Sequence, residues 1–355
     1  MMVAPMHRAP IPTVSIVVPT YRRAELLRRA LLSVRDQTFT NWELIVSNDD
    51  PGDSNAGLVV REVFGSDPRV RYIINTGAHG QSGNVNNALQ AATGKWIKPL
   101  FDDDVLKPDA LRRMMLAADS CPGAAIVRCL TEQIINGRRH SAERIGRRST
   151  VELIRQRDAH IAMYLQDLDI GTPTSVLVHH RVIDAGVLFE APDGISSSVD
   201  GWWFIRALRH GDLALCNEPL VEMHQGAHET VTSETDDDER YEQFELLRRW
   251  LLPMIDLDHE PPPLESTQGM VRLIRAACDT VHGRPITGIR RALAERDPLA
   301  WRLATRWALR RAAPGRFEAV QRRRVHTSAI QPTPAPPNAA SHHQYTMPLQ
   351  ETVVA

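Results

Sequence analysis

Residues 13–21 read TVSIVVPTY, and two similar runs follow, WELIVSNDD at 42–50 and KWIKPLFDDD at 95–104. Each run is apolar nearly throughout and rich in β-branched residues, which is typical of a strand buried on both faces of a parallel sheet. A shorter run, RVRYIIN at 69–75, has the same character. Together these runs predict the strands of one sheet, the first of them ended by Pro19.

Amphipathic segments separate the predicted strands. Residues 24–37 place leucine and alanine at helical spacing with arginines outside that stripe, and helical patterns recur at 55–65, 83–94 and 108–120. Alternation of strand and helix indicates an α/β fold with a mostly parallel central sheet flanked by helices. Ligands of such sheets bind beyond the carboxyl ends of the strands, and both acidic runs fall there. Further along, residues 149–166 are predicted to be helical.

Composition and net charge limit the classes of function that are open to this protein. The 355 residues are 43% hydrophobic and 24% charged, with a formal net charge of −1. These values are typical of a globular protein, and the missing basic excess argues against a nucleic-acid partner. None of the four cysteines has CxxC spacing, so we expect buried, reduced thiols. With no apolar run of about 18 residues and no signal-peptide core at the N-terminus, the chain is expected in the cytoplasm.

Three consecutive carboxylates, Asp102, Asp103 and Asp104, directly follow the strand predicted at 95–101. Clustered carboxylates repel one another unless a cation or hydrogen-bond donors neutralise them. Carboxylates suit hard cations such as Mg²⁺ and Mn²⁺, which complete their coordination with substrate phosphates. A solvated surface turn is the alternative for an acidic triplet. The position after an apolar strand favours a divalent metal site.

Several motifs taken together carry a resemblance. They are the first strand with its Pro-Thr-Tyr-Arg end, the Leu-x-Ser-Val-x-x-Gln helix at 31–37, the asparagine-rich helix before the acids, and the acidic run before Pro108. This combination resembles the family-2 glycosyltransferases over residues 13–115 and, more loosely, over 165–232. The resemblance implies a GT-A fold, a nucleoside-diphosphate sugar donor, Mn²⁺ or Mg²⁺ as cofactor, and an inverting transfer to a saccharide or lipid-linked acceptor.

The resemblance assigns the donor site by position. Asp103 is expected to be the main metal ligand, with Asp104 assisting, although the contiguous triplet replaces a spaced Asp-x-Asp pattern. Asn48 stands where the family often has an aspartate that contacts the base, and its amide oxygen still accepts a hydrogen bond. The remaining residues expected to hold the nucleotide sugar are Pro19, Thr20, Tyr21, Asp49, Asn86 and Asp102.

A second constellation, SSVDGWWFIRALRHG at 197–211, resembles the family's catalytic helix. Asp200 matches the carboxylate that acts as general base, and Val199 replaces a neighbouring acid. An aspartate of ordinary pKa is ionised at neutral pH and accepts the proton of the attacking hydroxyl. A plain helix N-terminal acid, placed there for the helix dipole, is the alternative.

The same resemblance suggests a third metal or diphosphate ligand and an acceptor pocket. His224 follows the strand after Asp200 and is assigned to the metal or diphosphate, with a packed histidine as the alternative. Aromatic faces pack on sugar rings, although one tryptophan of the pair is expected in the core. The residues expected to bind the acceptor are Gly171, Thr172, Trp202 and Trp203.

These assignments divide the chain into a flexible arm at 1–12, a nucleotide-sugar-binding half at 13–130, an acceptor-binding and catalytic half at 131–255, a C-terminal helical extension at 261–324 and a disordered tail at 325–355. In the extension, residues 298–312 mix tryptophan with arginine. This helix either packs on the catalytic domain or contacts an anionic membrane surface.

Three other functions compete with a glycosyltransferase. A non-catalytic nucleotide-sugar-binding module fits the departures at Asn48 and Val199. A nucleotidyltransferase also joins an α/β sheet to a metal-bound acid pair, but PTYRRAELL after the first strand lacks the glycines expected of that class. A scaffold protein would carry its acidic clusters only as surface. The identity of the sugar, the base and the acceptor, and the oligomeric state, stay open.

Overall fold

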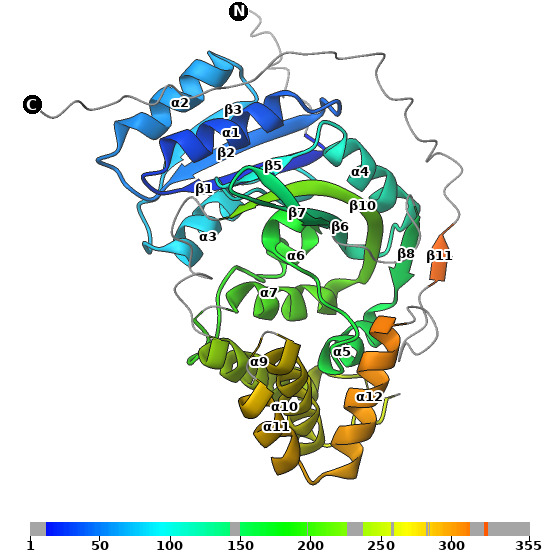
Figure 1. Ribbon diagram of the computed structural model, residues 1–355. Coiled ribbons are helices and arrows are strands. Elements are labelled where there is room, and N and C mark those ends of the chain that lie inside the picture. The colour runs from blue at the N-terminus through cyan, green and yellow to red at the C-terminus, as the bar shows by residue number, and fades with distance from the viewer. Residues whose placement is uncertain are drawn as a thin grey trace, which may run out of the picture.

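The computed structural model describes residues 12–142, 150–196, 198–225, 237–256, 259–281, 283, 285–312 and 323–325. The predicted arm at 1–12 and tail at 325–355 lie almost entirely outside these residues. One sheet runs through the molecule, with helices packed on it and a group of helices at one end (Figure 1). Among the described helices, none is both long and apolar enough to cross a bilayer.

The predicted strand–helix alternation is present in the N-terminal half. Its strands pair in parallel in the order β3-β2-β1-β4, and its helices are α1, α2, α3 and α4. The bounds are β1 Val14–Thr20, α1 Ala24–Arg35, β2 Trp42–Asn48, α2 Ser54–Phe64, β3 Val70–Ile74, α3 Gln81–Ala91, β4 Trp96–Pro99, β5 Asp104–Leu106 and α4 Ala110–Ser120.

Beyond these parallel strands the sheet is mixed. β9 pairs antiparallel with both β4 and β6, whereas β10 runs parallel to β6 and antiparallel to β5 and β8. The bounds are β6 Ala124–Ile135, β7 Arg138–Ala142, β8 Val151–Ile154, α5 Gln156–Tyr164, β9 Val176–His179, α6 Arg181–Asp184, α7 Val199–Ala207, β10 Asp212–Gln225 and β11 Arg323–Val325. Short 3-10 turns lie at Pro173–Ser175, Leu208–His210 and Leu252–Met254.

Two apolar layers cover the two faces of the sheet. Alternate residues of β1 point to opposite faces, as the two-residue period of a strand requires. Ile16 and Val18 pack with the buried stripes of α1, α2 and α4, whereas Val17 packs with α3, α5 and α7. Gly94 allows the chain before β4 to approach β1 closely, because a Cβ there would lie 2.7 Å from the backbone nitrogen of Ser15.

The helical extension is confirmed. After α9 (Asp237–Leu251), the chain forms α10 (Leu264–Val281), α11 (Pro285–Ala294) and α12 (Pro298–Ala312). Trp307 and Leu303 of α12 pack against α10, and Arg310 forms a buried ion pair with Asp167. Of the two alternatives for 298–312, packing on the protein is the one that these contacts favour.

Candidate active site

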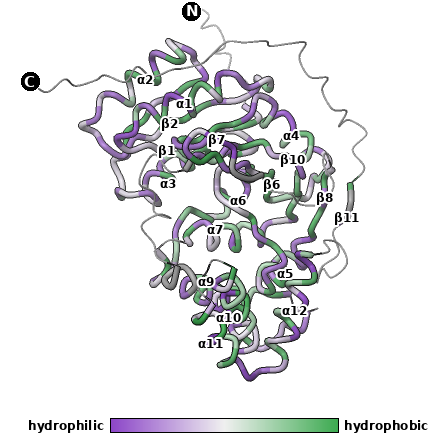
Figure 2. Tube along the Cα trace, viewed as in Figure 1, coloured by the Kyte–Doolittle hydropathy of each residue, from purple (hydrophilic) through white to green (hydrophobic). Residues whose placement is uncertain are grey.

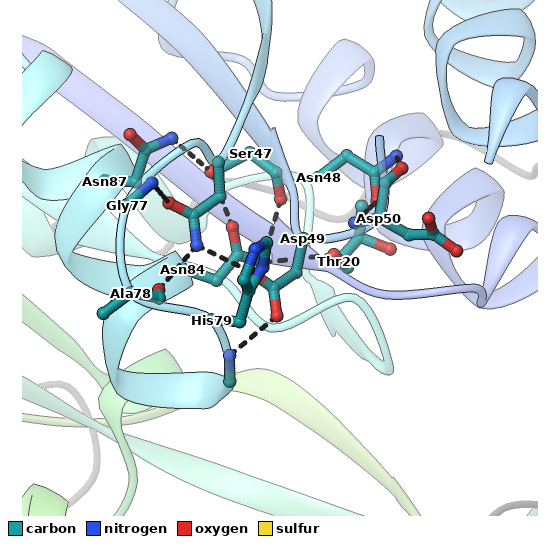
Figure 3. A network of polar contacts seen from close by, with 12 residues as sticks. Thr20, Ser47, Asn48, Asp49, Asp50, Gly77, Ala78, His79, Asn84 and Asn87 are labelled. Atoms are coloured by element: carbon teal, nitrogen blue, oxygen red, sulfur yellow. Dashed lines mark hydrogen bonds and ion pairs between the residues drawn. The ribbon is translucent and has the colours of Figure 1, made fainter. Parts of the chain in front are cut away.

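The polar network at the carboxyl ends of β1, β2 and β3 is the first part of the site (Figure 3). Asp49 is its centre. Its carboxylate accepts hydrogen bonds from Asn75 Nδ2 at 2.6 Å and from the backbone nitrogen of Gly80 at 2.8 Å, and His79 Nδ1 lies 3.2 Å away. The loop between β3 and α3 is therefore folded over the end of β2.

Asn84, which sequence reasoning missed, ties β1 to β2. Its Nδ2 donates to the carbonyl oxygens of Thr20 and Ser47, both at 3.1 Å, and its Oδ1 accepts from Ser47 Oγ at 2.6 Å. The expected helix residue, Asn86, faces elsewhere: its side chain bonds the backbone nitrogen and oxygen of Phe189 at 2.7 and 3.0 Å. Both ends of the Asn86 amide are used there. The α3 asparagines at the strand ends are instead Asn84 and Asn87, whose Nδ2 donates to Ser47 Oγ at 2.8 Å.

Asn48 is fully buried and its amide is used inside the loop. Nδ2 donates to Tyr72 Oη at 2.9 Å and to the carbonyl oxygens of Asp50 and Asp53 at 2.8 and 3.2 Å. This geometry supports the loop rather than presenting the Asn48 amide to a base. Tyr21, by contrast, is 50% exposed at the end of β1.

The acidic run lies beside this network. Asp102 is buried and accepts a hydrogen bond from Thr20 Oγ1 at 2.7 Å, which connects the ends of β1 and β4. Arg23 Nη1 lies 3.6 Å from the Asp102 carboxylate and 3.7 Å from that of Asp103. Residues expected at the donor site, Thr20 and Asp102, are thus in direct contact.

Asp104 turns inward. Burial, more than the neighbouring Asp103, raises its pKa to about 7, whereas a hydrogen bond with Thr174 opposes that rise. Lys98 is completely buried, and burial lowers its pKa to about 8. Its ammonium group donates to the carbonyl oxygens of Pro99, at 2.9 Å, and of Thr174. A buried positive charge therefore lies under the acidic run, a feature that sequence reasoning missed.

His224 reaches the acidic run through strand pairing. β5 pairs antiparallel with β10 in a register that sets Asp104 opposite Met223. Arg29 of α1 donates to the carbonyl oxygen of Asp103 at 3.3 Å and lies 3.4 Å from His224 Nδ1. The structure thus brings together an acid and a histidine that are more than a hundred residues apart in the sequence.

The side chains of Asp103 and His224 suit a divalent cation whose remaining ligands are phosphate oxygens. Within the part of the chain that the structure describes, no three acidic, histidine or cysteine side chains form a ready-made cage. Mg²⁺ sites of phosphate chemistry typically use one or two protein carboxylates and complete their shell with water and phosphate. His224 Nε2 is buried without a hydrogen bond among the described residues, 3.5 Å from a Glu222 oxygen. This nitrogen and the Asp103 carboxylate are suitable ligands.

Asp200 lies in the first turn of α7, on the second half of the chain. Burial raises its pKa to about 6, and the charge of Asp169 adds to that rise, whereas a hydrogen bond from the backbone nitrogen of Gly201 opposes it. That bond is 2.8 Å long. A carboxyl with a pKa near 6 is mostly ionised at pH 7 and is a stronger base than an exposed aspartate.

The loop at 169–175 connects Asp200 to the acidic run. Asp169, at one end, is close enough to Asp200 to influence its pKa. At the other end Thr174 Oγ1 accepts from the Phe101 nitrogen at 3.2 Å and bonds Asp104. Between them, Thr172 Oγ1 lies 3.8 Å from Met223 Sδ, next to His224. The loop with the predicted acceptor residues Gly171 and Thr172 therefore borders both charged groups.

Gln243 of α9 holds the segment that leads into α7. Its Oε1 accepts from the backbone nitrogens of Ser196 and Ser198 at 3.0 and 3.1 Å, and its Nε2 donates to Ser196 Oγ at 2.5 Å. A pocket of about 350 Å³ lies beside these groups, lined by Gly194, Ile195, Ser196, Glu242, Gln243 and Leu246. No local sequence signal marks Gln243, because its role depends on a contact between segments 45 residues apart.

The two tryptophans of α7 are both buried. Trp203 is completely inaccessible, its Nε1 donates to the Val187 carbonyl at 3.2 Å, and its ring packs edge-on against Phe189. It has no free face for a sugar, so the acceptor role expected of Trp203 does not hold. Trp202 is 8% exposed and packs against Trp250 of α9, which is 42% exposed.

Comparisons with known proteins agree with this architecture. Residues 15–185 match the model of glycosyl transferase family 2. A Campylobacter jejuni GalNAc(5)-diNAcBac-PP-undecaprenol beta-1,3-glucosyltransferase is 36% identical over 124 residues, which are 35% of this chain and 40% of the relative. The Escherichia coli enzyme WfgD, a UDP-Glc:alpha-D-GlcNAc-diphosphoundecaprenol beta-1,3-glucosyltransferase, is 39% identical over 92 residues, 26% of this chain and 35% of the relative.

The chain spans less than half the length of the curated relatives it matches. Among solved structures, S. aureus TarS in complex with UDP-GlcNAc superposes with a TM-score of 0.57 over 76% of this chain and 74% of that one, at 16% identity. This likeness concerns the fold. The strand order, the acidic run at the strand ends and the family match lead to one conclusion: residues 15–185 form a glycosyl transferase family 2 domain with a GT-A fold.

Proposed function

We propose that the protein transfers a sugar from a nucleoside-diphosphate sugar to a hydroxyl group of a saccharide or lipid-linked acceptor, with inversion at the anomeric carbon. One observation carries this proposal. The loop at 169–175 borders the acidic run with His224 on one side and Asp200 on the other. A donor diphosphate and an attacking hydroxyl placed against these two charged groups would meet across that loop.

The donor is expected over the ends of β1 and β2. Tyr21 offers an exposed ring there, and Thr20 and Asp102 are already fixed to each other at 2.7 Å. Asp49 keeps the overlying loop in place through its bond to Gly80. The relative WfgD is named for the donor UDP-Glc, and the TarS structure is a complex with UDP-GlcNAc. UDP-sugars are therefore the first donors to test.

A divalent cation, Mn²⁺ or Mg²⁺, would be held by Asp103 and His224, and the buried carboxyl group of Asp104 would assist them. Bound there, the cation would neutralise the charge that develops on the leaving diphosphate. The protein's own contribution is to set these groups in place through the pairing of β5 with β10 and through Arg29, which contacts both Asp103 and His224.

Asp200 acts as the general base. It takes the proton from the acceptor hydroxyl as the oxygen forms its bond to the anomeric carbon, while the bond from that carbon to the diphosphate oxygen breaks. Its raised pKa of about 6 suits a base at neutral pH. The Ser196–Ser198 segment, bound to Gln243, positions the start of the helix that carries Asp200.

A non-catalytic binding module, a nucleotidyltransferase and a scaffold remain the competing functions. Thermal shift with Mn²⁺ and UDP separates the scaffold from the others, since a ligand at about 100 times its dissociation constant stabilises the fold by about 2.7 kcal/mol. We expect a shift that Asp103→Asn abolishes and that Asp36→Asn, an exposed acid on the far end of α1, preserves. No shift with any nucleoside diphosphate would contradict donor binding.

Turnover separates the remaining functions. Incubation with UDP-sugars, Mn²⁺ and undecaprenyl-diphosphate-linked sugars, followed by mass spectrometry, should show free UDP and an acceptor enlarged by one sugar. EDTA should stop the reaction and added Mn²⁺ restore it. Binding without transfer across a full donor panel would support the binding module, and release of pyrophosphate from a nucleoside triphosphate with a sugar phosphate would support the nucleotidyltransferase.

A further inference from the structure

Helix α11 is packed with its apolar side outward. Of its ten residues, only Gly288 is buried. Ile286 is 68% exposed, Ile289 54% and Leu293 77%. Their spacing of three and four residues places them on one side of the helix, and we call these three residues the α11 patch. Figure 2 shows α10, α11 and α12 at the end of the molecule away from β1 and β2.

The orientation of α11 is set by its inner face. A Cβ at Gly288 would lie 2.4 Å from the Ala276 carbonyl oxygen and 2.6 Å from Thr280 Oγ1, so only glycine fits against α10 there. Arg291 adds an ion pair with Asp279 of α10 at 2.7 Å. A rotation that buried the α11 patch would bring larger side chains to a contact that has no room for a Cβ. The patch therefore faces away from α10 because of the packing.

The surroundings of the patch are basic. Residues 285–312 contain seven arginines and two acids, in a chain whose net charge is −1. Both acids are engaged within the protein: Glu295 pairs with Arg272 at 2.7 Å, and Asp297 accepts from the Leu299 nitrogen at 2.8 Å. α11 itself has no acid, and Arg290 is exposed next to Ile289.

We propose that the α11 patch inserts into the headgroup region of an anionic lipid bilayer. Exposed aliphatic residues on a helix with arginines and no acids are the composition of interfacial helices, which bind anionic lipids through apolar burial and charge together. A second copy of the chain fits less well, because a two-fold contact would set the arginines of one patch against those of the other. This inference is independent of which sugar is transferred.

Flotation of the purified full chain with vesicles tests the proposal. We expect binding to vesicles of phosphatidylcholine with about 30% phosphatidylglycerol and weak binding to pure phosphatidylcholine, since each basic residue contributes about a fivefold gain near an anionic surface. The triple variant Ile286→Gln, Ile289→Gln, Leu293→Gln should lose at least about tenfold in partitioning. Leu58→Gln on α2, 56% exposed, is the matched control and should bind like wild type.

A second variant keeps the experiment decisive. Arg290→Gln should weaken binding to anionic vesicles but leave binding to neutral ones unchanged. Because all four substituted positions on α11 are exposed, circular dichroism should show the fold retained. Equal partitioning of the triple variant and wild type, or no binding of wild type to anionic vesicles, would overturn the proposal. So would a dimer in light scattering that the triple variant disrupts, because the occupant would then be a second copy.

Discussion

Replacing the Asp200 carboxylate by an isosteric amide, Asp200→Asn, should separate catalysis from stability. The amide cannot accept the proton of the acceptor hydroxyl, and removal of a general base typically lowers kcat by about 10²–10⁴-fold. Donor binding should be retained, because the acidic run and Asp200 lie at opposite ends of the 169–175 loop. The measurement is initial transfer rate against donor concentration, with the donor KM expected to change little.

The pH profile follows from the pKa of about 6 for Asp200. Wild-type kcat/KM should fall on the acid side with an apparent pKa near that value. At pH 5 only about a tenth of the carboxyl groups would be ionised, so the rate should be about tenfold below its plateau. The residual activity of Asp200→Asn should lack this acid limb.

Asp200→Asn should raise the thermal stability of the protein although it lowers the transfer rate. Folding raises the pKa of Asp200 from 3.8 to about 6, so the folded state favours the protonated carboxyl. Below pH 3.8 the group is protonated in both states and has no effect, and the cost of holding it ionised grows as pH rises to about 6. At pH 7 the full cost is present, at most about 3 kcal/mol at 1.36 kcal/mol per unit.

Asp200→Asn should therefore raise Tm by a few degrees at pH 7, and the gain should shrink as pH falls toward 4. Asp193→Asn, an exposed acid in the loop before α7, provides the control for the loss of one negative charge and should change neither rate nor Tm. The reasoning would be refuted if Asp200→Asn transferred sugar within fivefold of the wild-type rate, or if its Tm at pH 7 were lower than that of wild type.

Substitutions at three further positions test the supporting structure. Gln243→Ala leaves the backbone nitrogens of Ser196 and Ser198 without their acceptor, so kcat should fall while the donor KM changes little. Gln243→Glu still offers an acceptor and should recover part of the lost kcat in the same kinetic assay. Asn84→Ala removes two donors that join β1 to β2 and should cost about 1–3 kcal/mol in urea unfolding. Gly94→Ala forces a Cβ to within 2.7 Å of a backbone nitrogen and should destabilise by about 1–3 kcal/mol, read from the same urea midpoints.

Local patterns were sufficient for the N-terminal half. The predicted strands at 13–21, 42–50 and 69–75 and the helices between them agree with the structure, because a buried parallel strand and an amphipathic helix each have their own period. At 149–166 the prediction was partly wrong. VELI forms β8 before α5 begins, since its pairing with β10 outweighs the helical pattern that follows.

The second half could not be predicted to the same depth, because its order depends on pairing between distant segments. β9 lies between β4 and β6 and pairs antiparallel with both. No turn motif in the sequence predicts that place in the sheet. The same limit applies to individual side chains. Two adjacent tryptophans, Trp202 and Trp203, suggest a surface for stacking on a sugar ring, but packing against Trp250 and Phe189 buries both.

The pairing of β5 with β10 is the long-range contact on which the metal-binding hypothesis depends. It sets Asp104 opposite Met223, one residue before His224. Because side chains alternate between the faces of a strand, a shift of one residue would turn His224 away from the acidic run. Lys107 reinforces the register through its backbone nitrogen, which donates to the Leu220 carbonyl at 2.9 Å. Sequence motifs could supply the acid and the histidine, but only this register makes them neighbours.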